Sequence, residues 1–411
     1  MFPLMGLLNR MIFWELLKVF VLSLVGLTAL VLIAGIISEA SKLGLSPGQL
    51  IEIIPLLIPT TLPYTIPATT LFASCVVYGR LSNDNETVAM KAAGLDLLTI
   101  LRPAVLLGVL TGAATLAMAE TIIPRSQTEI QLRVIEDPEE VLYATLKRER
   151  RLKYPSLKYV VYVRDVQGKR LIDVVVKQRS SVKNDEYGQH YDYDFVARTR
   201  EARLVVDMEA RTLTIDADKW EIADGKTLLS SAGAKPPELP LPDSFDAKAV
   251  KSKAIALEWD EIELRFDELT ADRQKLVDAR AENFKKSEAE ADPILKQKIL
   301  AEDVSYREKV KEADRQIRTV QYEFHSRPAL AFGCLCFALV GCPVGIWANR
   351  ADYLSTFVIC FLPVVFIYYP IHLAGSGLAR EGKIPMIVGV WLANTTVGLA
   401  AIALTYRLIR R

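Results

Sequence analysis

The chain has 411 residues, of which 51% are hydrophobic and 24% are charged, and its formal net charge is +1. The two kinds of residue are segregated along the chain, which argues against a soluble protein, where both would be spread along the sequence. The net charge therefore averages two environments, and we expect no nucleic-acid partner.

Six stretches without Lys, Arg, Asp or Glu predict six transmembrane helices. Crossing the hydrocarbon core takes about 20 helical residues, and a charge at the centre of such a helix costs about 2.5–3.5 kcal/mol. The alternative, six buried helices of a large soluble core, would need six such runs by chance. The stretches are Phe20–Ser38, Ile53–Gly79, Pro103–Ala119, Pro328–Asn349, Tyr353–Ala379 and Ile384–Tyr406.

Lys and Arg in the short loops predict the orientation, since they mark the cytoplasmic side. Nine of them lie on the side of the N-terminus, whereas the short loops of the other side hold only Lys42, Arg380 and Lys383. We therefore expect both termini in the cytoplasm and the large domain outside. The first apolar segment is too long for a signal-peptide core, so it remains as an anchor.

This pattern assigns residues 1–124 to transmembrane helices 1–3 and residues 326–411 to helices 4–6. Helix 2 carries four prolines at intervals of four residues, from Pro55 to Pro67, which should curve or kink it. Helix 3 is expected to end at Pro124.

The loop at residues 79–98, between helices 2 and 3, is predicted to hold a short amphipathic helix. Ser82 or Asn83 would cap this helix, and Gly94 would end it. A partner that grips the short helix would move helices 2 and 3 together. The alternative is an ordinary connecting loop with a basic flank. The polar residues offered to the cytoplasm would be Asp84, Asn85 and Glu86.

Residues 125–243 are predicted to form β structure of the sandwich or jelly-roll type. Lys158–Arg164 and Arg170–Lys177 flank a turn, Asp165–Lys169, that contains Gly168, which indicates a β-hairpin. Four prolines between residues 236 and 242 close the segment. Further strands are expected at Tyr193–Arg198, Ala202–Asp207, Thr212–Asp216 and Lys219–Ala223.

Residues 244–325 change to dense charge with helical periodicity. One helix is expected around Ile262–Phe284, and Pro293 separates it from a second helix, so the pattern predicts a helical hairpin. A solvated, charged helical pair is typical of a spacer or docking surface rather than a catalytic unit. A coiled-coil seam in the second helix is indicated by Val310, Ala313, Ile317, Val320 and Phe324.

No catalytic or metal-binding pattern is present in the sequence. The three histidines are far apart, and all five cysteines fall in apolar segments, where we interpret them as packing residues. Gly225-Lys226-Thr227 is not a phosphate-binding loop, because Trp220 occupies the position of the required glycine. His372 is interpreted as a packing or cavity-lining residue, because a proton relay needs acidic partners at membrane depth. We therefore expect no enzyme activity, metal or bound cofactor in this chain.

Residues Gly79–Leu95 resemble the coupling-helix signature of the LptF/LptG permease family, which exports lipopolysaccharide. The resemblance covers most of the chain: three helices, an external jelly-roll domain and three more helices. It includes the C-terminal patterns Arg327-Pro328, Cys342-Pro343-Val344-Gly345, Lys383-Ile384-Pro385 and Trp391-Leu392-Ala393-Asn394.

The resemblance implies a permease of the bacterial inner membrane with a periplasmic β domain. It also implies a cytoplasmic ABC ATPase dimer, which would use the ATP, and a second permease subunit that is a paralogue or another copy. A periplasmic jelly-roll bridge protein would receive the substrate, lipopolysaccharide or a similar glycolipid.

The resemblance also implies roles for single residues. Arg80 and Glu86, with Asp84 and Asn85 between them, match the loop that docks on the ATPase. Lys42 matches a region whose basic residues face the lipid phosphates; alternatively, it is an anchor that snorkels to the headgroups. An apolar slot for the lipid, or simply the core of the β domain, would be formed by Val160, Tyr162, Val174, Val176, Phe195, Val205 and Leu213.

The charged insert, roughly residues 250–320, departs from the family pattern, in which a short connector is usual. It would prop the jelly roll, contact a partner or replace an accessory protein. Two other functions stay open: a membrane-anchored envelope scaffold or adaptor, and a permease for another lipidated substrate. A scaffold would not need the loop around Glu86.

Overall fold

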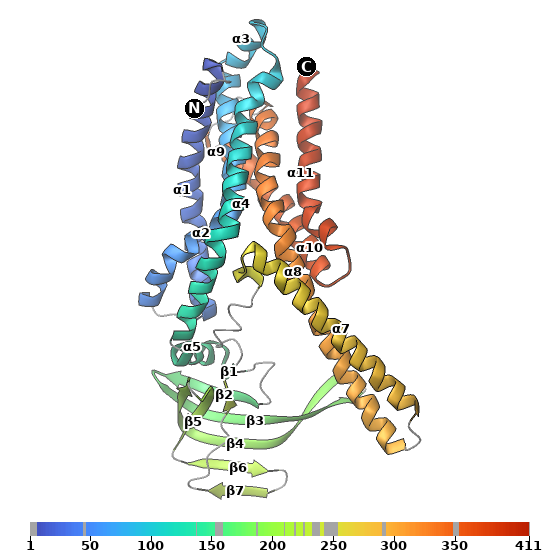
Figure 1. Cartoon of the computed structure of the whole chain (residues 1–411). Coiled ribbons are helices and arrows are strands. Elements are labelled where there is room, and N and C mark those ends of the chain that lie inside the picture. The colour runs from blue at the N-terminus through green and yellow to red at the C-terminus, as the bar shows by residue number, and fades with distance from the viewer. Residues whose placement is uncertain are drawn as a thin grey trace. The chain divides into compact units, whose positions relative to one another are not determined.

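The computed structural model describes residues 6–43, 47–136, 138–152, 159–185, 188–208, 210–217, 219–224, 227–231, 239–241, 254–289, 293–347 and 353–410. The chain divides into two compact units (Figure 1). The helical unit comprises residues 1–31, 58–125 and 254–411, and the sheet unit comprises residues 32–57 and 126–253.

Long helices build the helical unit, and three of them, α1, α2 and α4, continue into the residues of the sheet unit. The elements are α1 (Leu7–Leu43), α2 (Pro47–Asn83), α3 (Glu86–Ala92), α4 (Leu97–Glu136), η2 (Ala254–Ala256), α7 (Trp259–Ala289), α8 (Pro293–Trp347), α9 (Tyr353–Pro363), η3 (Val364–Tyr368), α10 (Tyr369–Arg380) and α11 (Met386–Ile409).

Five helices in the described part of the chain are long and apolar enough to cross a membrane. Five of the six predicted segments overlap them over most of their length. The remaining segment, Ile53–Gly79, is helical in α2, but its four prolines and five threonines make it less apolar, and it is not among the five. Six transmembrane helices therefore stay a prediction. The five spans are Leu7–Ile36, Leu97–Leu132, Glu302–Trp347, Ser355–Arg380 and Met386–Ile409.

Glycines let two other helices approach α8 closely. A Cβ atom on Gly341 of α8 would lie 2.6 Å from a side chain of α2, and one on Gly112 of α4 would lie 2.7 Å from the Ala331 carbonyl oxygen. Gly345 and Gly108, four residues away on the same helices, make equally close approaches to the same neighbours. Small residues spaced by four let membrane helices pack backbone to backbone, so α2 and α4 are both held directly against α8.

A buried asparagine links three of these elements. Asn394 of α11 donates through Nδ2 to the Ala329 carbonyl of α8 at 2.5 Å and accepts from the Tyr368 hydroxyl of η3 at 3.0 Å. His372 is buried and stacks on the Tyr368 ring with an interplanar angle of 8°, as expected for a packing residue. Hydrogen bonds of this kind hold helices together where no water competes.

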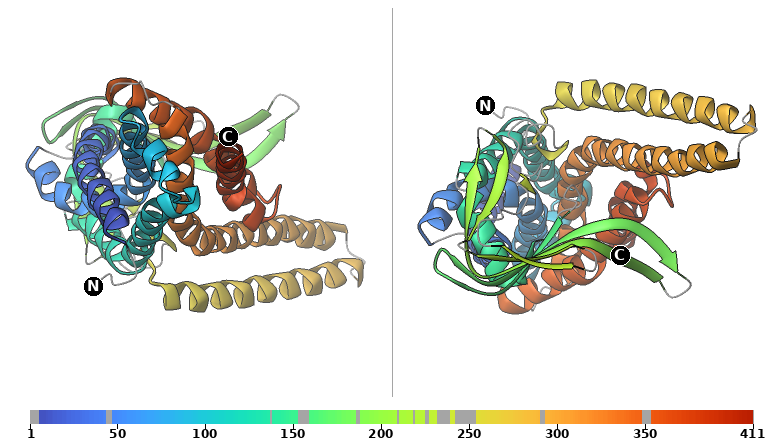
Figure 2. Two further views of the ribbon diagram at one scale, coloured as in Figure 1. Left: turned by 90° about the horizontal axis from the view of Figure 1, so that it is seen from above. Right: turned by 90° about the horizontal axis from the view of Figure 1, so that it is seen from below.

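α7 and α8 form the predicted helical hairpin, and both views of Figure 2 show them lying side by side. Leu269 of α7 and Val320 of α8 are buried between them. Further along, Arg280 pairs with Asp303 at 2.8 Å. The apolar contacts and ion pairs together fix the two helices in one alignment.

α8 is a single helix of 55 residues, about 80 Å long at 1.5 Å per residue. It crosses the expected border between the insert and helix 4 without interruption, although Pro328 lies inside it. A proline removes one backbone hydrogen bond, and contacts from neighbouring helices compensate for this in membrane proteins. The second helix of the hairpin and the apolar segment are therefore parts of one continuous helix.

The sheet unit holds an eight-stranded antiparallel sheet in the order β1-β2-β3-β4-β5-β8, with β6 pairing to β4 and β7 to β6. The described strands do not establish a jelly roll, which stays a prediction. The elements are α5 (Pro138–Glu149), β1 (Arg151–Leu152), β2 (Tyr159–Gln167), β3 (Arg170–Asp185), β4 (Gly188–Asp207), β5 (Thr212–Asp216), β6 (Trp220–Asp224), β7 (Thr227–Ser231) and β8 (Leu239–Pro240).

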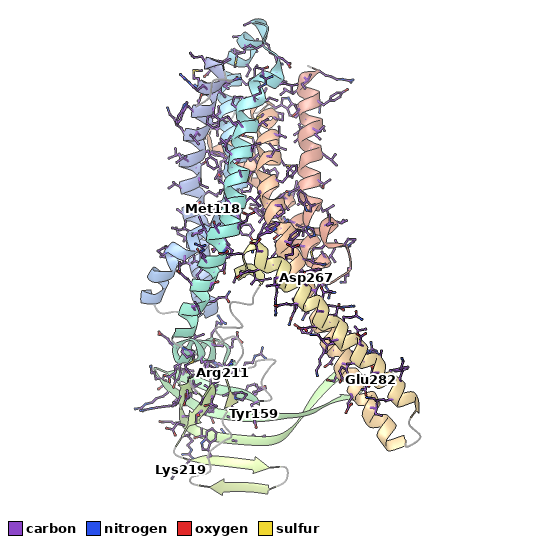
Figure 3. The ribbon with its side chains drawn as sticks, in the orientation of Figure 1. Met118, Tyr159, Arg211, Lys219, Asp267 and Glu282 are labelled. Atoms are coloured by element: carbon purple, nitrogen blue, oxygen red, sulfur yellow. The ribbon has the colours of Figure 1, made fainter. Side chains whose placement is uncertain are left out.

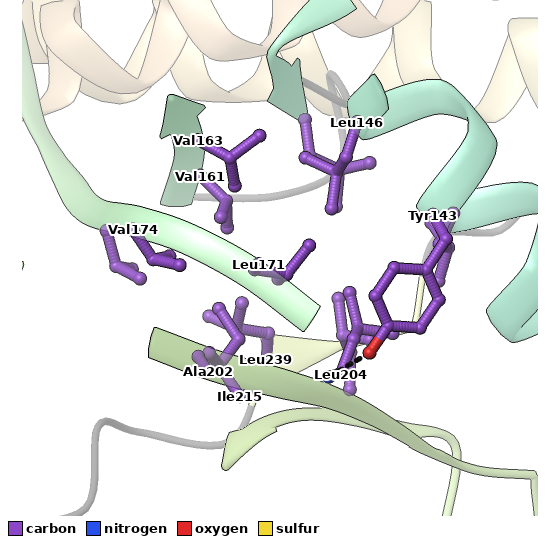
Figure 4. Close-up of a cluster of buried hydrophobic side chains, with 14 of the residues drawn as sticks. Tyr143, Leu146, Val161, Val163, Leu171, Val174, Ala202, Leu204, Ile215 and Leu239 are labelled. Carbon is purple, nitrogen blue, oxygen red and sulfur yellow. Dashed lines mark hydrogen bonds between the residues drawn. The ribbon is translucent and has the colours of Figure 1, made fainter. Parts of the chain in front are cut away.

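The core of the sheet unit lies between α5 and the strands (Figure 4). Leu146 of α5 and Leu171 of β3 are fully buried there. The Tyr143 hydroxyl accepts from the Leu204 backbone N–H at 2.8 Å and donates to the Lys169 carbonyl at 2.9 Å. This one side chain therefore fastens α5 to strand β4 and to the β2–β3 turn.

Two expectations are wrong for the start of the predicted β region, because residues 125–136 and 138–149 are helical. α4 does not end at Pro124 but continues to Glu136, since its next residues are good helix formers that tolerate one missing hydrogen bond. α5 then begins at Pro138, whose fixed φ suits the first helical position. Acidic residues in its first turn and basic residues in its last turn complement the helix dipole.

The predicted strands are confirmed as β2 to β6; β3 and β4 are longer than predicted, β5 has the predicted bounds, and β6 is shifted by one residue. Tyr193–Arg198 and Ala202–Asp207 join in the single strand β4. The hairpin turn is shorter than expected, because Gln167 pairs with Arg170 and only two residues connect them. Gly168 has a φ of 61°, a left-handed conformation that is unfavourable for most residues with a side chain. β1, β7 and β8 were not expected from the sequence.

Candidate functional site

A short helix, α3, connects α2 to α4 at the end of the helical unit that also holds the C-terminus (Figure 1). The predicted caps Ser82 and Asn83 are wrong, because both residues still belong to α2. α3 instead follows Asn85, whose φ of 59° is left-handed, and no side chain caps it. Asparagine adopts this conformation more readily than most residues, so the chain turns sharply here.

The end of α3 lies where the sequence predicts it, at Gly94. The Gly94 N–H donates to the Lys91 carbonyl at 3.0 Å, and the Leu95 N–H donates to the Met90 carbonyl at 3.1 Å. These two bonds form a Schellman motif, which needs a left-handed residue and therefore favours glycine (φ 84°).

Packing holds α3 against the membrane helices, and hydrogen bonds tie down the end of α2 that leads into it. Met90 is buried in the core of the bundle, among residues of α1, α2, α4 and α8. The buried Tyr78 hydroxyl donates to the Ile100 carbonyl of α4 at 2.7 Å, and the Ser82 hydroxyl donates to the Ile346 carbonyl of α8 at 3.2 Å. A displacement of α3 must therefore disturb α2, α4 and α8 together.

The structure does not bring the four predicted coupling residues into one cluster. Arg80, in the last turn of α2, pairs with Glu15 of α1 at 2.6 Å, so its guanidinium connects two helices of the same chain. Asp84 and Asn85 are exposed in the turn, and Glu86 is half-buried at the start of α3. Three of the four residues therefore face the end of the bundle, with Arg80 beneath them.

The sequence-based prediction of the site did not include three apolar residues of the loop that the structure shows to be exposed. Val88 is 62% exposed, Leu98 54% and Leu95 36%. The buried positions of α3, Thr87 and Met90, place Val88 on the outer side of the helix. Val88 could have been noticed in the sequence as an apolar residue of a short polar helix. Its exposure can be recognised only once the buried face of α3 is known. Apolar and polar residues exposed together are typical of a protein–protein interface.

A cavity of about 220 Å³ lies between α1, α2, α9 and η3. η3 is a turn of π-helix at Val364–Tyr368, and such segments are frequent at functional sites. Leu30 of α1 is 59% exposed beside the cavity, so the cavity borders the outer surface of the bundle. The lining residues are Ser23, Gly26, Leu27, Leu30, Ala68, Thr69, Phe72, Phe357, Cys360, Phe361 and Val364.

The predicted interior of the β domain needs one correction. Val205 is 47% exposed, because its neighbour Leu204 points into the core and side chains alternate along a strand. Tyr162 is half-buried. The side chains of Phe195 and Lys42 lie outside the described residues. The other candidates are buried, namely Val160, Val174, Val176 and Leu213.

Within the described residues, no group of three or more His, Cys, Asp or Glu side chains is arranged to hold a metal ion. The described cysteines are buried and unpaired by disulfides. What the structure offers instead is an exposed loop that is fastened to the membrane helices and a small apolar cavity between them.

Comparison with known families gives one match, which covers nearly the whole chain. The model of the lipopolysaccharide export system permease LptF/LptG matches residues 10–407. A search of curated proteins finds no match. Members of the matched family are permease subunits rather than enzymes, and together with the apolar helices the match makes this a multi-pass membrane protein. The chain belongs to the LptF/LptG family of lipopolysaccharide export permeases.

Proposed function

We propose that this chain is the permease subunit of an ATP-driven exporter that takes lipopolysaccharide or a similar glycolipid out of the bacterial inner membrane. A separate cytoplasmic ABC ATPase dimer supplies the energy, and both termini of the chain lie in the cytoplasm. The sheet unit lies in the periplasm and passes the lipid to a jelly-roll bridge protein.

The observation that carries the proposal is the attachment of α3. An ATPase that moves α3 acts on the bundle through the buried Met90 and through α2, which leads into α3. The end of α2 is tied to α4 by the Tyr78–Ile100 hydrogen bond and to α8 by the Ser82–Ile346 hydrogen bond. The close glycine contacts pack α8 tightly against α2 and α4, so we expect these three helices to move together. Movement of the loop therefore shifts α2, α4 and α8 together.

The exposed surface formed by the turn before α3, α3 itself and the start of α4 suits a soluble protein partner. Val88 and Leu98 supply apolar contact, and Asp84, Asn85 and Glu86 supply polar contacts around it. An apolar centre with a polar rim is the usual composition of such interfaces. ATP binds to the partner, and this chain binds no cofactor.

The size of the cavity supports a second permease subunit. A drug-sized ligand needs roughly 300–1,000 Å³, and a glycolipid with several acyl chains needs more. The 220 Å³ between α1, α2 and α9 therefore holds only part of such a lipid. The apolar side chains beside it, such as Leu22 (78% exposed) and Leu30, are available for the lipid and for a second permease chain.

Lipid release from proteoliposomes tests the proposal. The chain is reconstituted with its partner permease and the ABC ATPase in liposomes that contain lipopolysaccharide, and a soluble jelly-roll acceptor is added. ATP should transfer lipopolysaccharide to the acceptor, and vanadate should stop the transfer. ATP hydrolysis without any transfer to the acceptor would contradict the proposal.

A further inference from the structure

A groove opens between α7 and α8 at the end of the hairpin nearest the apolar segment of α8. Its volume is about 260 Å³. The charge-free run of α8 begins shortly after His325, at Pro328, so the groove lies just outside the part expected to cross the membrane. The lining residues are Ile262, Glu263, Phe266, Val320, Gln321, Phe324 and His325.

The floor of the groove is apolar and open to solvent. The Phe324 ring contacts the Trp259 ring with centroids 4.8 Å apart and a tilt of 43°, yet Phe324 remains 38% exposed. Phe266 of α7 also lines the groove and is half-buried. In a hairpin that is otherwise highly charged, aromatic side chains that are accessible in a groove mark a binding surface.

The α7 side of the groove carries a row of carboxylates. Asp260, Glu263 and Asp267 are exposed and share one face of α7, because they are spaced by three and four residues. None of them has an ion-pair partner in the described part of the chain. Like charges at this spacing destabilise a helix, so cations from another molecule would relieve the repulsion.

The distal half of α7 is different. Asp272 pairs with Lys275 at 2.8 Å and Glu282 pairs with Lys286 at 2.9 Å. Figure 3 shows Asp267 near the groove end of α7 and Glu282 near the other end. Asp278, also in this half, accepts a hydrogen bond from the Gln274 side chain at 3.0 Å. A row of three carboxylates without ion pairs is described only beside the groove.

We infer that this groove binds a basic amphipathic helix of a partner protein. The apolar side of that helix packs over Phe266 and Phe324 as a third helix against the hairpin. Its Lys and Arg side chains lie along Asp260, Glu263 and Asp267. The same carboxylates repel anionic lipid headgroups and acidic peptides, so charge complementarity selects a cationic helix. The inference concerns an interaction surface of the insert and does not depend on the transport activity.

Two synthetic peptides test this inference on the full-length chain in nanodiscs of uncharged phosphatidylcholine. One is a short helix of Leu and Lys, and the other has Glu in place of Lys. Fluorescence anisotropy, corrected with empty nanodiscs, should show binding of the Leu/Lys helix only. The double variant Glu263→Lys with Asp267→Lys should weaken this binding by about tenfold and should bind the Leu/Glu helix instead.

The double variant Asp272→Lys with Glu282→Lys is the matched control, because it makes the same charge change on the same helix away from the groove. It should leave the binding of both peptides unchanged. A photo-crosslinking amino acid at Gln321 should capture the Leu/Lys helix. Equal binding of both peptides by the unmodified chain would overturn the inference, and so would capture of phosphatidylcholine at Gln321.

Discussion

Replacing Gly389 by alanine should destabilise the contact between α10 and α11. A Cβ atom at this position would lie 2.5 Å from the Gly375 carbonyl oxygen and 2.7 Å from the Ala379 Cβ. Carbon–oxygen contacts are normally about 3.3 Å or longer, so the two helices would have to separate by roughly 0.8 Å. Overpacking of this kind costs about 1–3 kcal/mol.

Gly377→Ala is the matched control. Gly377 lies in α10 and has no atom within 4 Å of the position of a Cβ. Alanine is favoured over glycine inside a helix by about 0.5–1 kcal/mol at both positions, so this gain cancels in the comparison. The free energies of unfolding of the two variants should therefore differ by about 1–3 kcal/mol, with Gly377→Ala the more stable.

Reversible unfolding in mixed detergent micelles, followed by tryptophan fluorescence, measures this difference. The packing argument is refuted if Gly389→Ala is as stable as Gly377→Ala. Such a result would mean that the helices separate at no cost, and that close backbone contact does not hold this part of the bundle.

Three further predictions concern other contacts. Tyr143→Phe should destabilise the sheet unit by about 1–3 kcal/mol in denaturant unfolding, because a buried backbone N–H loses its acceptor. Asn394→Leu should lower the stability of the helices in micelles by about 0.6–1.7 kcal/mol. The hydrogen bond from Arg198 lowers the pKa of Asp173, so the stability that this pair contributes is present at neutral pH and is lost as the pH falls through that lowered pKa. In acid titrations followed by circular dichroism, Asp173→Asn should remove this part of the pH dependence.

The helices of this protein were largely predictable because the membrane imposes a simple rule on them. A stretch without charges that is long enough to cross the bilayer becomes a helix, and each of the six stretches is helical over most of its described length. The rule does not locate helix ends, since it takes Pro124 as a stop where α4 continues to Glu136. Proline breaks an isolated helix, but packing against neighbours compensates for the lost hydrogen bond.

The contacts between the helices could not be read from the sequence. Gly341 and Gly112 are recognisable as small residues, but which helix each one faces depends on the three-dimensional arrangement. The same limit explains Val205, which was assigned to the wrong side of its strand. A shift of one residue reverses every side chain of a strand, and the sequence pattern around Val205 fits either choice.

The loop at the candidate site was predicted in part. Gly94 marks the end of α3, because few other residues adopt its left-handed conformation. The start was missed, because Asn85 turns the chain through its own backbone instead of through a capping side chain. The exposure of Val88 was missed because it depends on which face of α3 is packed against the bundle.

Co-purification of ATPase activity tests the central claim, that a separate ATPase drives this permease through α3. The tagged chain is purified in mild detergent as the unmodified protein and as Glu86→Lys, Val88→Asp and Glu381→Lys. Glu381 lies in the turn between α10 and α11, at the other end of the helices from α3 (Figure 1). Vanadate-sensitive ATPase activity should accompany the unmodified chain and Glu381→Lys and should be lost from both α3 variants. The claim is contradicted if no ATPase activity accompanies the unmodified chain, or if all three variants retain it.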